Sequence, residues 1–534
     1  MFRARNPQKN LFSANNQFHH VLKPKSFYAL LADHGEDLFD DYSFEHLYCE
    51  NNGRPCVPPS QMFLLLLLQM HSGCSDEESI GRSYCDLRWS AVLDLEPGER
   101  LCGKCTLQEF RARLHLNETA EAQFHHLLKV AKKLGVLKGS NLKIAIDTTP
   151  VLGRGAVKDT YNLLGDGIRK LASALARTDG QKADAWAEEH SFSRYWRGLS
   201  FKGEAEIDWS NDAERRVFLN VLVADAQRLL LVAERYLDKV DEDDQEEVAK
   251  ASRILSRLIS QDTEPDPDPP KRNEDDSTFS DGEHSVLRIR KGVATKRVVS
   301  VHDTEMRHGR KSTSKRFDGY KLSLTTDTDS GFILSVDILE AGASDSTGAL
   351  EMIQATAVKA GLQVKKVIGD CAYGDGITRQ TFQDAGIELS AKVPNPPAKD
   401  LFPKSRFLLD LTNTIATCPA GHSTREWEYY RHRHGVQARF RFRAEDCKNC
   451  ASSQDCLRSK DKQRNRGRTI ALHPQEKLLI AARQRQKQPD FREDIKRRQV
   501  AEQRIARYFG KSKTKQQAIL TAIVANLGAI ANAA

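Results

Sequence analysis

Long hydrophobic runs are absent from this sequence of 534 residues. Its most apolar stretch, Phe63 to Leu68, is far shorter than the roughly 20 residues that a helix needs to cross a membrane. The first residues, Met1 to Pro7, lack the apolar segment of a secretory signal peptide. No internal repeat is present. These absences favour a cytoplasmic protein.

Disulfide bonds are not expected either, because the eleven cysteines are an odd number in a chain without an export signal. Four of them nonetheless lie close together in the sequence, at Cys418, Cys447, Cys450 and Cys456. Their pattern is C-x28-C-x2-C-x5-C, in which one C-x2-C pair and two further thiols could complete a tetrahedral Zn²⁺ site. His422 could replace one of the thiols. The paired spacing of a zinc ribbon is not met, so structural zinc and free thiols are the two interpretations.

The chain does contain enough apolar and charged sequence for a soluble protein of several modules. Apolar residues make up 39% and charged residues 29%, which is typical of a chain that forms a core beneath a polar surface. Because the length is too great for one compact domain, we expect roughly two to four modules.

Charge is unevenly distributed along the chain. The net charge of the whole sequence is only +8, but residues 458–516 contain 19 lysines and arginines against six acidic residues, a local excess of +13. Acidic stretches lie at 238–247 and 262–276. A basic segment of this density favours a polyanion partner, with nucleic acid the first candidate, over a basic helix face that contacts only solvent.

Two long regions of the sequence have a helical pattern. In residues 1–137, Ser75 and Glu78 have the spacing of a capping box at a helix start. Short helices joined by tight turns are compatible with a helix-turn-helix DNA reader and equally with a small helical bundle. The second helical region is 158–260, and the Pro- and Asp-rich segment that follows, 261–284, is predicted to be a disordered loop.

Alternating apolar residues indicate an α/β region in the rest of the chain. The segment Leu142 to Asp147 predicts a strand that ends on an acid. Residues 394–470, which contain the clustered cysteines, appear irregular, and helices at about 475–509 and 516–530 close the chain. Further strands are predicted at 320–325, 332–337, 364–370 and 388–393.

Two of the predicted strands deliver a carboxylate at the end of the strand. Asp147 and Asp370 are 223 positions apart, yet adjacent strands would bring them together at the sheet edge where α/β proteins build their sites. Two neighbouring carboxylates repel each other, and a divalent cation with a preference for oxygen ligands, such as Mg²⁺, relieves this repulsion. The alternative is that each acid only caps a turn or the following helix.

The residues around these acids resemble the conserved blocks of a group of bacterial insertion-sequence transposases, which belong to the DDE superfamily. The similarity extends over roughly residues 10 to 530 and includes a helical N-terminal domain. The blocks that carry it are Pro58–Leu95, Ile144–Leu164, Asp303–Lys311, Arg316–Lys321 and Ile368–Asp375. The resemblance implies a ribonuclease H-like catalytic core.

The third acid of such a site is expected on a helix near the C-terminus. The related signature has Tyr, Arg, Glu and Lys with two, three and six residues between them. Arg498 and Glu502 keep the Arg-to-Glu spacing, which places both on one helix face, but Ile495 and Phe509 stand at the Tyr and Lys positions. Glu502 is therefore the predicted third ligand. The alternatives are Glu493 and Asp494.

The resemblance also implies a chemistry and a set of partners. Asp147, Asp370 and Glu502 would hold two Mg²⁺ or Mn²⁺ ions for the cleavage and strand transfer of double-stranded DNA. The basic residues expected to contact this DNA are Lys321, Arg310, Lys311 and Arg498. We expect a homodimer when DNA is bound. The alternatives are an inactive DNA-binding remnant of such a transposase and a nuclease without strand transfer.

The same comparison gives an expected domain organisation. Residues 1–137 would form a helical, DNA-binding N-terminal domain, and residues 138–534 the catalytic domain. Two insertions would interrupt this second domain, a helical and partly disordered one at 158–300 and a cysteine-containing one at 394–470.

Overall fold

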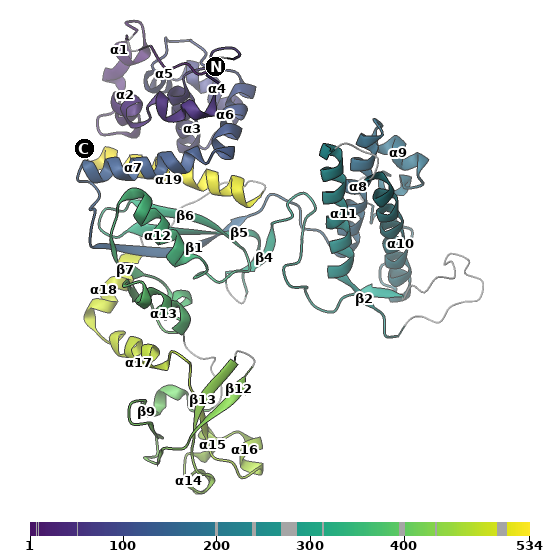
Figure 1. The fold of residues 1–534 in the computed structure, drawn as a ribbon, viewed down its shortest axis with the longest axis vertical. Helices are drawn as coiled ribbons and strands as arrows, with labels where there is room; N and C mark the ends of the chain where they lie inside the picture. Colours follow the sequence, from purple (N-terminus) through teal and green to yellow (C-terminus); the bar gives the residue numbers. More distant parts are fainter. Residues whose placement is uncertain are drawn as a thin grey trace.

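The fold was analysed in a computed structural model, which describes residues 1–6, 8, 10–50, 52–197, 201–237, 242–268, 286–311, 314–394, 401–432, 435–498 and 510–533. A mixed sheet lies at the centre, with a helical N-terminal region on one side of it (Figure 1). A helical bundle and a small cysteine-containing region extend away from this centre. No helix within the described segments is long and apolar enough to cross a membrane.

The central sheet is built around strand β1 (Leu142–Leu152). This strand pairs antiparallel with β5 (Arg316–Asp327) and parallel with β7 (Val364–Ile368). The outer strands are β6 (Ile333–Glu340) beside β5, and β8 (Glu388–Ser390) beside β7. A short strand, β4 (Arg307–Arg310), pairs with the first residues of β5, and helices α12 (Ala349–Ala360) and α13 (Gly376–Asp384) follow β6 and β7.

Strand β1 does not end at Asp147, as we predicted, but continues to Leu152. Residues Thr148 to Leu152 stay paired with β5, whereas pairing with β7 stops at Ala145. One edge of β1 is therefore open from this point on, and an open edge tolerates Pro150, which has no N–H to donate. The open edge lies next to the residues that follow β7, among them Asp370.

The N-terminal region is helical, as the pattern predicted. Ser75 caps its fourth helix, because its hydroxyl oxygen accepts a hydrogen bond from the Glu78 N–H, 3.2 Å away. The helices are α1 (Ala14–Phe18), α2 (Phe27–Leu38), α3 (Pro59–Ser72), α4 (Asp76–Cys85), α5 (Leu87–Leu93), α6 (Lys104–Leu116) and α7 (Thr119–Lys133).

The segment between β1 and β5 contains a helical bundle with its own hydrophobic cluster. Its main helices are α8 (Thr160–Thr178), α9 (Ala183–Glu189), α10 (Asp212–Leu237) and α11 (Glu242–Asp262). The bundle stands beside the sheet (Figure 1).

The first residues of the loop predicted for 261–284 are ordered into a helix end and a short strand. Helix α11 continues to Asp262, and Thr263–Pro265 (β2) pairs with Leu287–Ile289 (β3). Residues 269–285 lie outside the described part of the chain.

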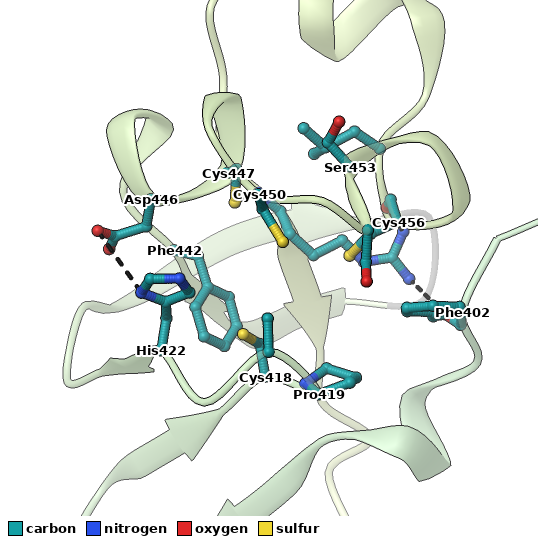
Figure 2. Close-up of a pocket in the computed structure, with 14 residues that line it drawn as sticks. Phe402, Cys418, Pro419, His422, Phe442, Asp446, Cys447, Cys450, Ser453 and Cys456 are labelled. Carbon is teal, nitrogen blue, oxygen red and sulfur yellow. Dashed lines mark hydrogen bonds and ion pairs between the residues drawn. The ribbon is translucent and has the colours of Figure 1, made fainter.

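The region 394–470, which we predicted to be irregular, contains short strands and helices. Its strands are β9 (Leu408–Asp410), β10 (Ile415–Thr417), β11 (Ser423–Thr424), β12 (Trp427–His432), β13 (Gly435–Arg441) and β14 (Thr469–Ala471). Its helices, α14 (Ala444–Lys448), α15 (Ser453–Cys456) and α16 (Ser459–Gln463), carry or adjoin the residues around the pocket of Figure 2. Four of these six strands, β9, β10, β11 and β14, have only two or three residues and are too short to show the alternation on which our prediction depended.

The basic helix predicted at 475–509 is divided in two. Helix α17 (Glu476–Arg485) ends before Pro489, and α18 (Pro489–Arg497) begins there. Proline favours the first position of a helix and disrupts a helix interior, so the break has a local cause in the sequence.

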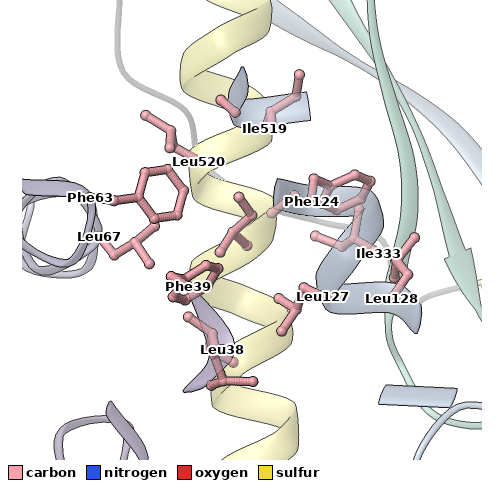
Figure 3. Close-up of a cluster of buried hydrophobic side chains, with 14 of the residues drawn as sticks. Leu38, Phe39, Phe63, Leu67, Phe124, Leu127, Leu128, Ile333, Ile519 and Leu520 are labelled. Carbon is pink, nitrogen blue, oxygen red and sulfur yellow. The ribbon is translucent and has the colours of Figure 1, made fainter. Parts of the chain in front are cut away.

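The last helix, α19 (Lys511–Ala533), fastens the N-terminal helices to the sheet. It contacts α3 and α7 as well as β6. Figure 3 shows it between Phe63 and Leu67 on one side and Phe124 and Leu127 on the other. These side chains belong to one buried cluster that also includes Ile144 of the central strand. The N-terminal helices and the sheet thus share a hydrophobic core.

Candidate active site

Beside the open edge of β1 lies a cavity of about 480 Å³. It brings together the first two predicted acids and the four predicted DNA-contacting residues. These six residues come from five separate places in the sequence. The cavity is lined by Asp147, Thr148, Thr149, Pro150, Arg310, Lys311, Phe317, Lys321, Asp345, Asp370 and Arg498.

Asp147 is held in this cavity by its place in the middle of β1. One of its carboxylate oxygens accepts a hydrogen bond of 2.9 Å from the Thr148 N–H, and the other lies 3.4 Å from the Arg498 guanidinium. Burial raises the pKa of Asp147, and the nearby carboxylates of Asp370 and Asp345 raise it further, although Arg498 and the Thr148 N–H act in the opposite direction. The ionised form of Asp147 is therefore less stable in this cavity than in water.

Asp370 stands two residues after the end of β7 and begins a short 3₁₀ helix, η4 (Cys371–Tyr373). Its carboxylate accepts a hydrogen bond of 2.8 Å from the Ala372 N–H. Within the described segments, no cationic side chain forms an ion pair with Asp370. The carboxylate of Asp370 can consequently accept further hydrogen bonds or bind a cation in the cavity that it lines.

The cavity contains a third carboxylate, Asp345, which the sequence pattern did not identify as a site residue. It lies in the turn between β6 and α12, five residues beyond the strand end, where no strand pattern draws attention to it. The Lys321 ammonium donates to its carboxylate over 2.6 Å and to the Ala343 carbonyl over 2.7 Å. The available signal was that Asp345, like Asp370, lies in the connection between a strand and the following helix.

The Tyr373 hydroxyl is fully buried near these carboxylates. Burial raises its pKa most, followed by the charges of Asp345, Asp147 and Asp370. The Ser323 hydroxyl is close to it, but neither group has a partner at hydrogen-bonding geometry among the described residues. An unsatisfied buried hydroxyl is costly, so its position beside three acids requires an explanation.

The predicted third ligand, Glu502, lies outside the described residues. Neither alternative from the sequence lines the cavity. Glu493 is exposed and pairs with Arg497 over 2.7 Å. Asp494 is buried instead beside Lys366, whose ammonium lies 3.0 Å from its carboxylate, and it accepts a hydrogen bond from Ser390.

The four clustered cysteines line a second, much smaller pocket of about 20 Å³, together with His422 (Figure 2). The Arg468 N–H points at the Cys447 sulfur over 3.4 Å, which is the kind of contact that stabilises a thiolate. As the side chains stand, no three His, Cys, Asp or Glu residues of the described segments converge closely enough to hold a metal ion. Among the described residues, therefore, neither this pocket nor the carboxylate cavity presents three of its acidic, thiol or imidazole groups in metal-binding geometry.

The fold and the larger cavity together define a class of protein. A five-strand path with β1 at its centre, flanked by an antiparallel and a parallel neighbour, presents clustered carboxylates and basic side chains in one cavity. This is the arrangement of an α/β protein with a ribonuclease H-like core, as expected from the sequence.

Comparison with known families gives the particular one. A model described as a transposase domain (DUF772) matches residues 17–113, and two models described as transposase DDE domains match residues 276–442 and 417–531. The chain belongs to the DDE transposases of insertion sequences. It is a DNA-cleaving and transposing enzyme whose family uses a divalent metal, typically Mg²⁺. No curated protein and no solved structure matches it.

The matched segments contain Asp370, Arg498 and Glu502 but not Asp147. The helical bundle separates β1 from the rest of the sheet in the sequence, so Asp147 stands alone between the first and second matched segments. Asp147 is brought close to Asp370 in space by the parallel pairing of β1 and β7.

Proposed function

We propose that this transposase cleaves DNA at the ends of an insertion sequence and joins the released ends to target DNA by a two-metal mechanism. Asp147, Asp370 and Glu502 would hold the two ions. The observation that carries the proposal is the convergence of Asp147 and Asp370, from two neighbouring strands, on a cavity that is also lined by four basic side chains.

The donor set fits a divalent cation with a preference for oxygen. The carboxylates of Asp370 and Asp345 lie close enough to contribute to the raised pKa of Asp147, and Asp370 has no side-chain cation of its own among the described residues. When bound, the ions would neutralise charge at the scissile phosphate and increase the acidity of an attacking water or hydroxyl. The carboxylates on β1 and after β7 would fix the positions of both ligand groups in advance.

The basic residues would position the DNA. Arg310 and Lys311, at the end of β4, and Arg498, after α18, line the cavity from two sides, and Lys321 lies on β5 between them. Contacts of this kind bind phosphate without reading sequence, and they orient the backbone for in-line attack. Water would first release a 3′-hydroxyl at the element end, and this hydroxyl would then attack the target strand.

We also propose that double-stranded DNA is bound by a homodimer, with residues 1–137 as a DNA-binding domain and 138–534 as the catalytic domain. The shared core of α19, α3 and α7 supports a rigid connection between these two parts. The insertions at 158–300 and 394–470 leave the sheet at connections between strands and helices, so they can extend without interrupting strand pairing.

A structural Zn²⁺ held by Cys418, Cys447, Cys450 and Cys456 is a separate proposal. It is supported by the common pocket of the four residues and by the N–H contact to the Cys447 sulfur. His422 lines the same pocket and is the alternative fourth ligand. Bound zinc would supply the stability that a region with a small hydrophobic cluster lacks.

The experiment for the catalytic proposal uses the full chain and labelled DNA that carries the inverted repeats flanking its reading frame. We expect Mg²⁺-dependent nicks at the repeat ends and joined products when target DNA is added. Nicks without joining would identify a nuclease, and DNA binding without nicks would identify an inactive remnant. Glu502→Gln should abolish cleavage, whereas Glu493→Gln should not. The reverse result would move the third ligand to Glu493.

A further inference from the structure

Asp345 differs from an ordinary surface acid because it forms a partly buried ion pair inside the cavity. Its side chain is 24% exposed, and the side chain of its partner Lys321 is 13% exposed. The Lys321 ammonium also donates to the Ala343 carbonyl, so the lysine is held against the turn that carries Asp345. Lys321 is therefore occupied by this pair and by the Ala343 carbonyl.

The three carboxylates of the cavity are neutralised unequally. Lys321 pairs with Asp345 over 2.6 Å and Arg498 with Asp147 over 3.4 Å, whereas Asp370 receives only a backbone hydrogen bond among the described residues. Both cationic side chains stand where a divalent cation would neutralise the same oxygens. Each of them was also assigned above to DNA phosphate.

The Tyr373 hydroxyl is independent evidence for a ligand at this place. It is buried outside the cavity lining, without a hydrogen-bond partner in the described segments, and it lies near enough to the three acids for their charges to raise its pKa. A hydroxyl with unused bonding capacity beside three carboxylates suits a site that normally contains a cation and its bound water.

We propose that Asp345 is a further carboxylate ligand of the divalent cation, and that Lys321 takes the place of this cation in the metal-free enzyme. Lys321 leaves Asp345 when the cation binds and then contacts DNA phosphate. The exchange moves an ammonium group from one oxygen anion to another and neither makes nor breaks a covalent bond. The inference rests on the proposed metal-dependent function of the cavity.

The exchange predicts opposite effects of the two partners on metal affinity. In DNA-free protein, Asp345→Asn should weaken Mn²⁺ binding by at least about tenfold, because a ligand should matter no less than the outer-shell groups, whose loss costs roughly 10–100-fold. Lys321→Gln should instead strengthen Mn²⁺ binding, because it removes the competing cation. Free Mn²⁺ is counted directly by electron paramagnetic resonance during a titration, which does not depend on activity.

A matched control is available on the same sheet. Asp337 lies on β6, 3.9 Å from the Lys515 ammonium, and lines a different cavity. Asp337→Asn should leave Mn²⁺ affinity unchanged. Thermal unfolding of each variant in chelator shows whether it is folded at the titration temperature. If Asp345→Asn proves unfolded there, Lys321→Gln alone must still show increased affinity for the proposal to stand.

DNA binding in EDTA provides the second measurement. Asp345→Asn should free Lys321 without metal, so it should bind DNA more tightly than the parent and steepen the dependence of log K on log salt by about 0.9, the value of one phosphate contact. The loss of a negative charge would also favour DNA in a nonspecific way. We therefore expect this steepening to disappear in the Lys321→Gln background, where only the nonspecific contribution remains.

Three results would overturn the inference. They are unchanged Mn²⁺ affinity in folded Asp345→Asn, weaker Mn²⁺ binding in Lys321→Gln, and an equal change of salt dependence with and without Lys321. Asp147→Asn separates this failure from failure of the proposed function. If Asp147→Asn loses Mn²⁺ while Asp345→Asn keeps it, the metal site stands and Asp345 is not part of it. If neither variant affects Mn²⁺, the catalytic proposal fails as well.

Discussion

The carboxylate cavity and the cysteine pocket each collect side chains that bind metal ions, but the two are built differently. The first is roomy, at about 480 Å³, and is lined by arginine and lysine as well as by acids. The second is small, at about 20 Å³, and places four thiols among residues such as Phe402, Phe442 and Leu457. One suits hydrated cations and a polyanion, and the other suits a soft, enclosed metal.

The two sites also limit the repulsion between their ligands in different ways. Burial raises the pKa of Cys447 and Cys456, and the neighbouring thiols raise it further, so these thiols keep their protons at neutral pH. The carboxylates cannot do the same at neutral pH to the same degree, because their ordinary pKa is near 4. They are accompanied by the cations of Lys321 and Arg498 instead.

This difference determines what each site must release to bind a metal. Zinc binding to the cysteine pocket would displace protons and would weaken as the pH falls. Metal binding in the carboxylate cavity would displace ammonium and guanidinium groups, which then become available to DNA. Only the second exchange couples metal binding to substrate binding, and the predictions below test this contrast.

The largest expected effect belongs to the carboxylates. Asp147→Ala or Asp370→Ala should lower the rate of DNA cleavage by at least about 10³-fold, since metal-ion stabilisation contributes several kcal/mol and about 1.4 kcal/mol corresponds to a factor of ten. DNA affinity should change little, because phosphate contacts carry most of it. Single-turnover cleavage and filter binding measure the two quantities. Cleavage at the parent rate by either variant would remove that residue from the site.

A smaller and purely structural effect is expected at the cysteine pocket. The purified, reduced protein should contain about one Zn²⁺ per chain, held by four ligands. Cys450→Ser should release zinc and increase hydrogen exchange in residues 418–456 while β1, β5 and β7 remain protected. Metal analysis and hydrogen-exchange mass spectrometry measure both effects.

Cys105→Ser is the matched control, because Cys105 is an exposed thiol on α6, outside this region. It should leave both zinc content and exchange unchanged. A folded, reduced parent protein without zinc would show that the four cysteines are free thiols, and the contrast between the two sites would then be one between a metal site and a small thiol-lined core.

The two sites were not equally predictable. Asp147 and Asp370 were recognisable because alternating apolar residues mark β1 and β7, and the sheet then brings their acids together. The predicted C-terminal end of the first strand was wrong, since β1 continues past Asp147 through a proline at an open edge. Asp345 could not be found in the same way, because it lies in a turn whose position depends on the pairing of β5 with β6.

The cysteine region shows the opposite limitation. The spacing of its cysteines was visible, but the strands that position them are two to seven residues long and carry no clear period. Their order depends on contacts between β12, β13 and β14 that are distant in sequence. By contrast, the break between α17 and α18 was predictable, because Pro489 marks it in the sequence.

A buried ion pair outside both sites distinguishes structural charges from exchangeable ones. Lys366 and Asp494 are 11% and 8% exposed and lie outside the cavity. Asp494→Ala should reduce the free energy of unfolding by about 1–3 kcal/mol, because the Lys366 ammonium and the Ser390 hydroxyl lose a buried acceptor, although Glu388 remains 3.2 Å from the ammonium. Glu493→Ala, which breaks an exposed pair, should cost no more than about 1 kcal/mol. Denaturant unfolding compares them, and similar losses would show that Asp494 is not structurally special.

The smallest effect concerns the stability of the metal-free carboxylate cavity. Because burial raises the pKa of Asp147 in the folded protein, the ionised carboxylate disfavours folding at pH values above the folded pKa. This penalty diminishes as the pH falls and is absent below the pKa of the unfolded chain, about 3.9. In EDTA, Asp147→Asn should therefore unfold at a higher temperature than the parent at pH 7, and the difference should shrink toward pH 4. Saturating Mg²⁺ should reverse the order at pH 7, since only the parent gains stability from the metal. A variant that is less stable in EDTA at pH 7 would mean that the ion pair with Arg498 outweighs burial, and that this acid is already fully compensated before any metal arrives.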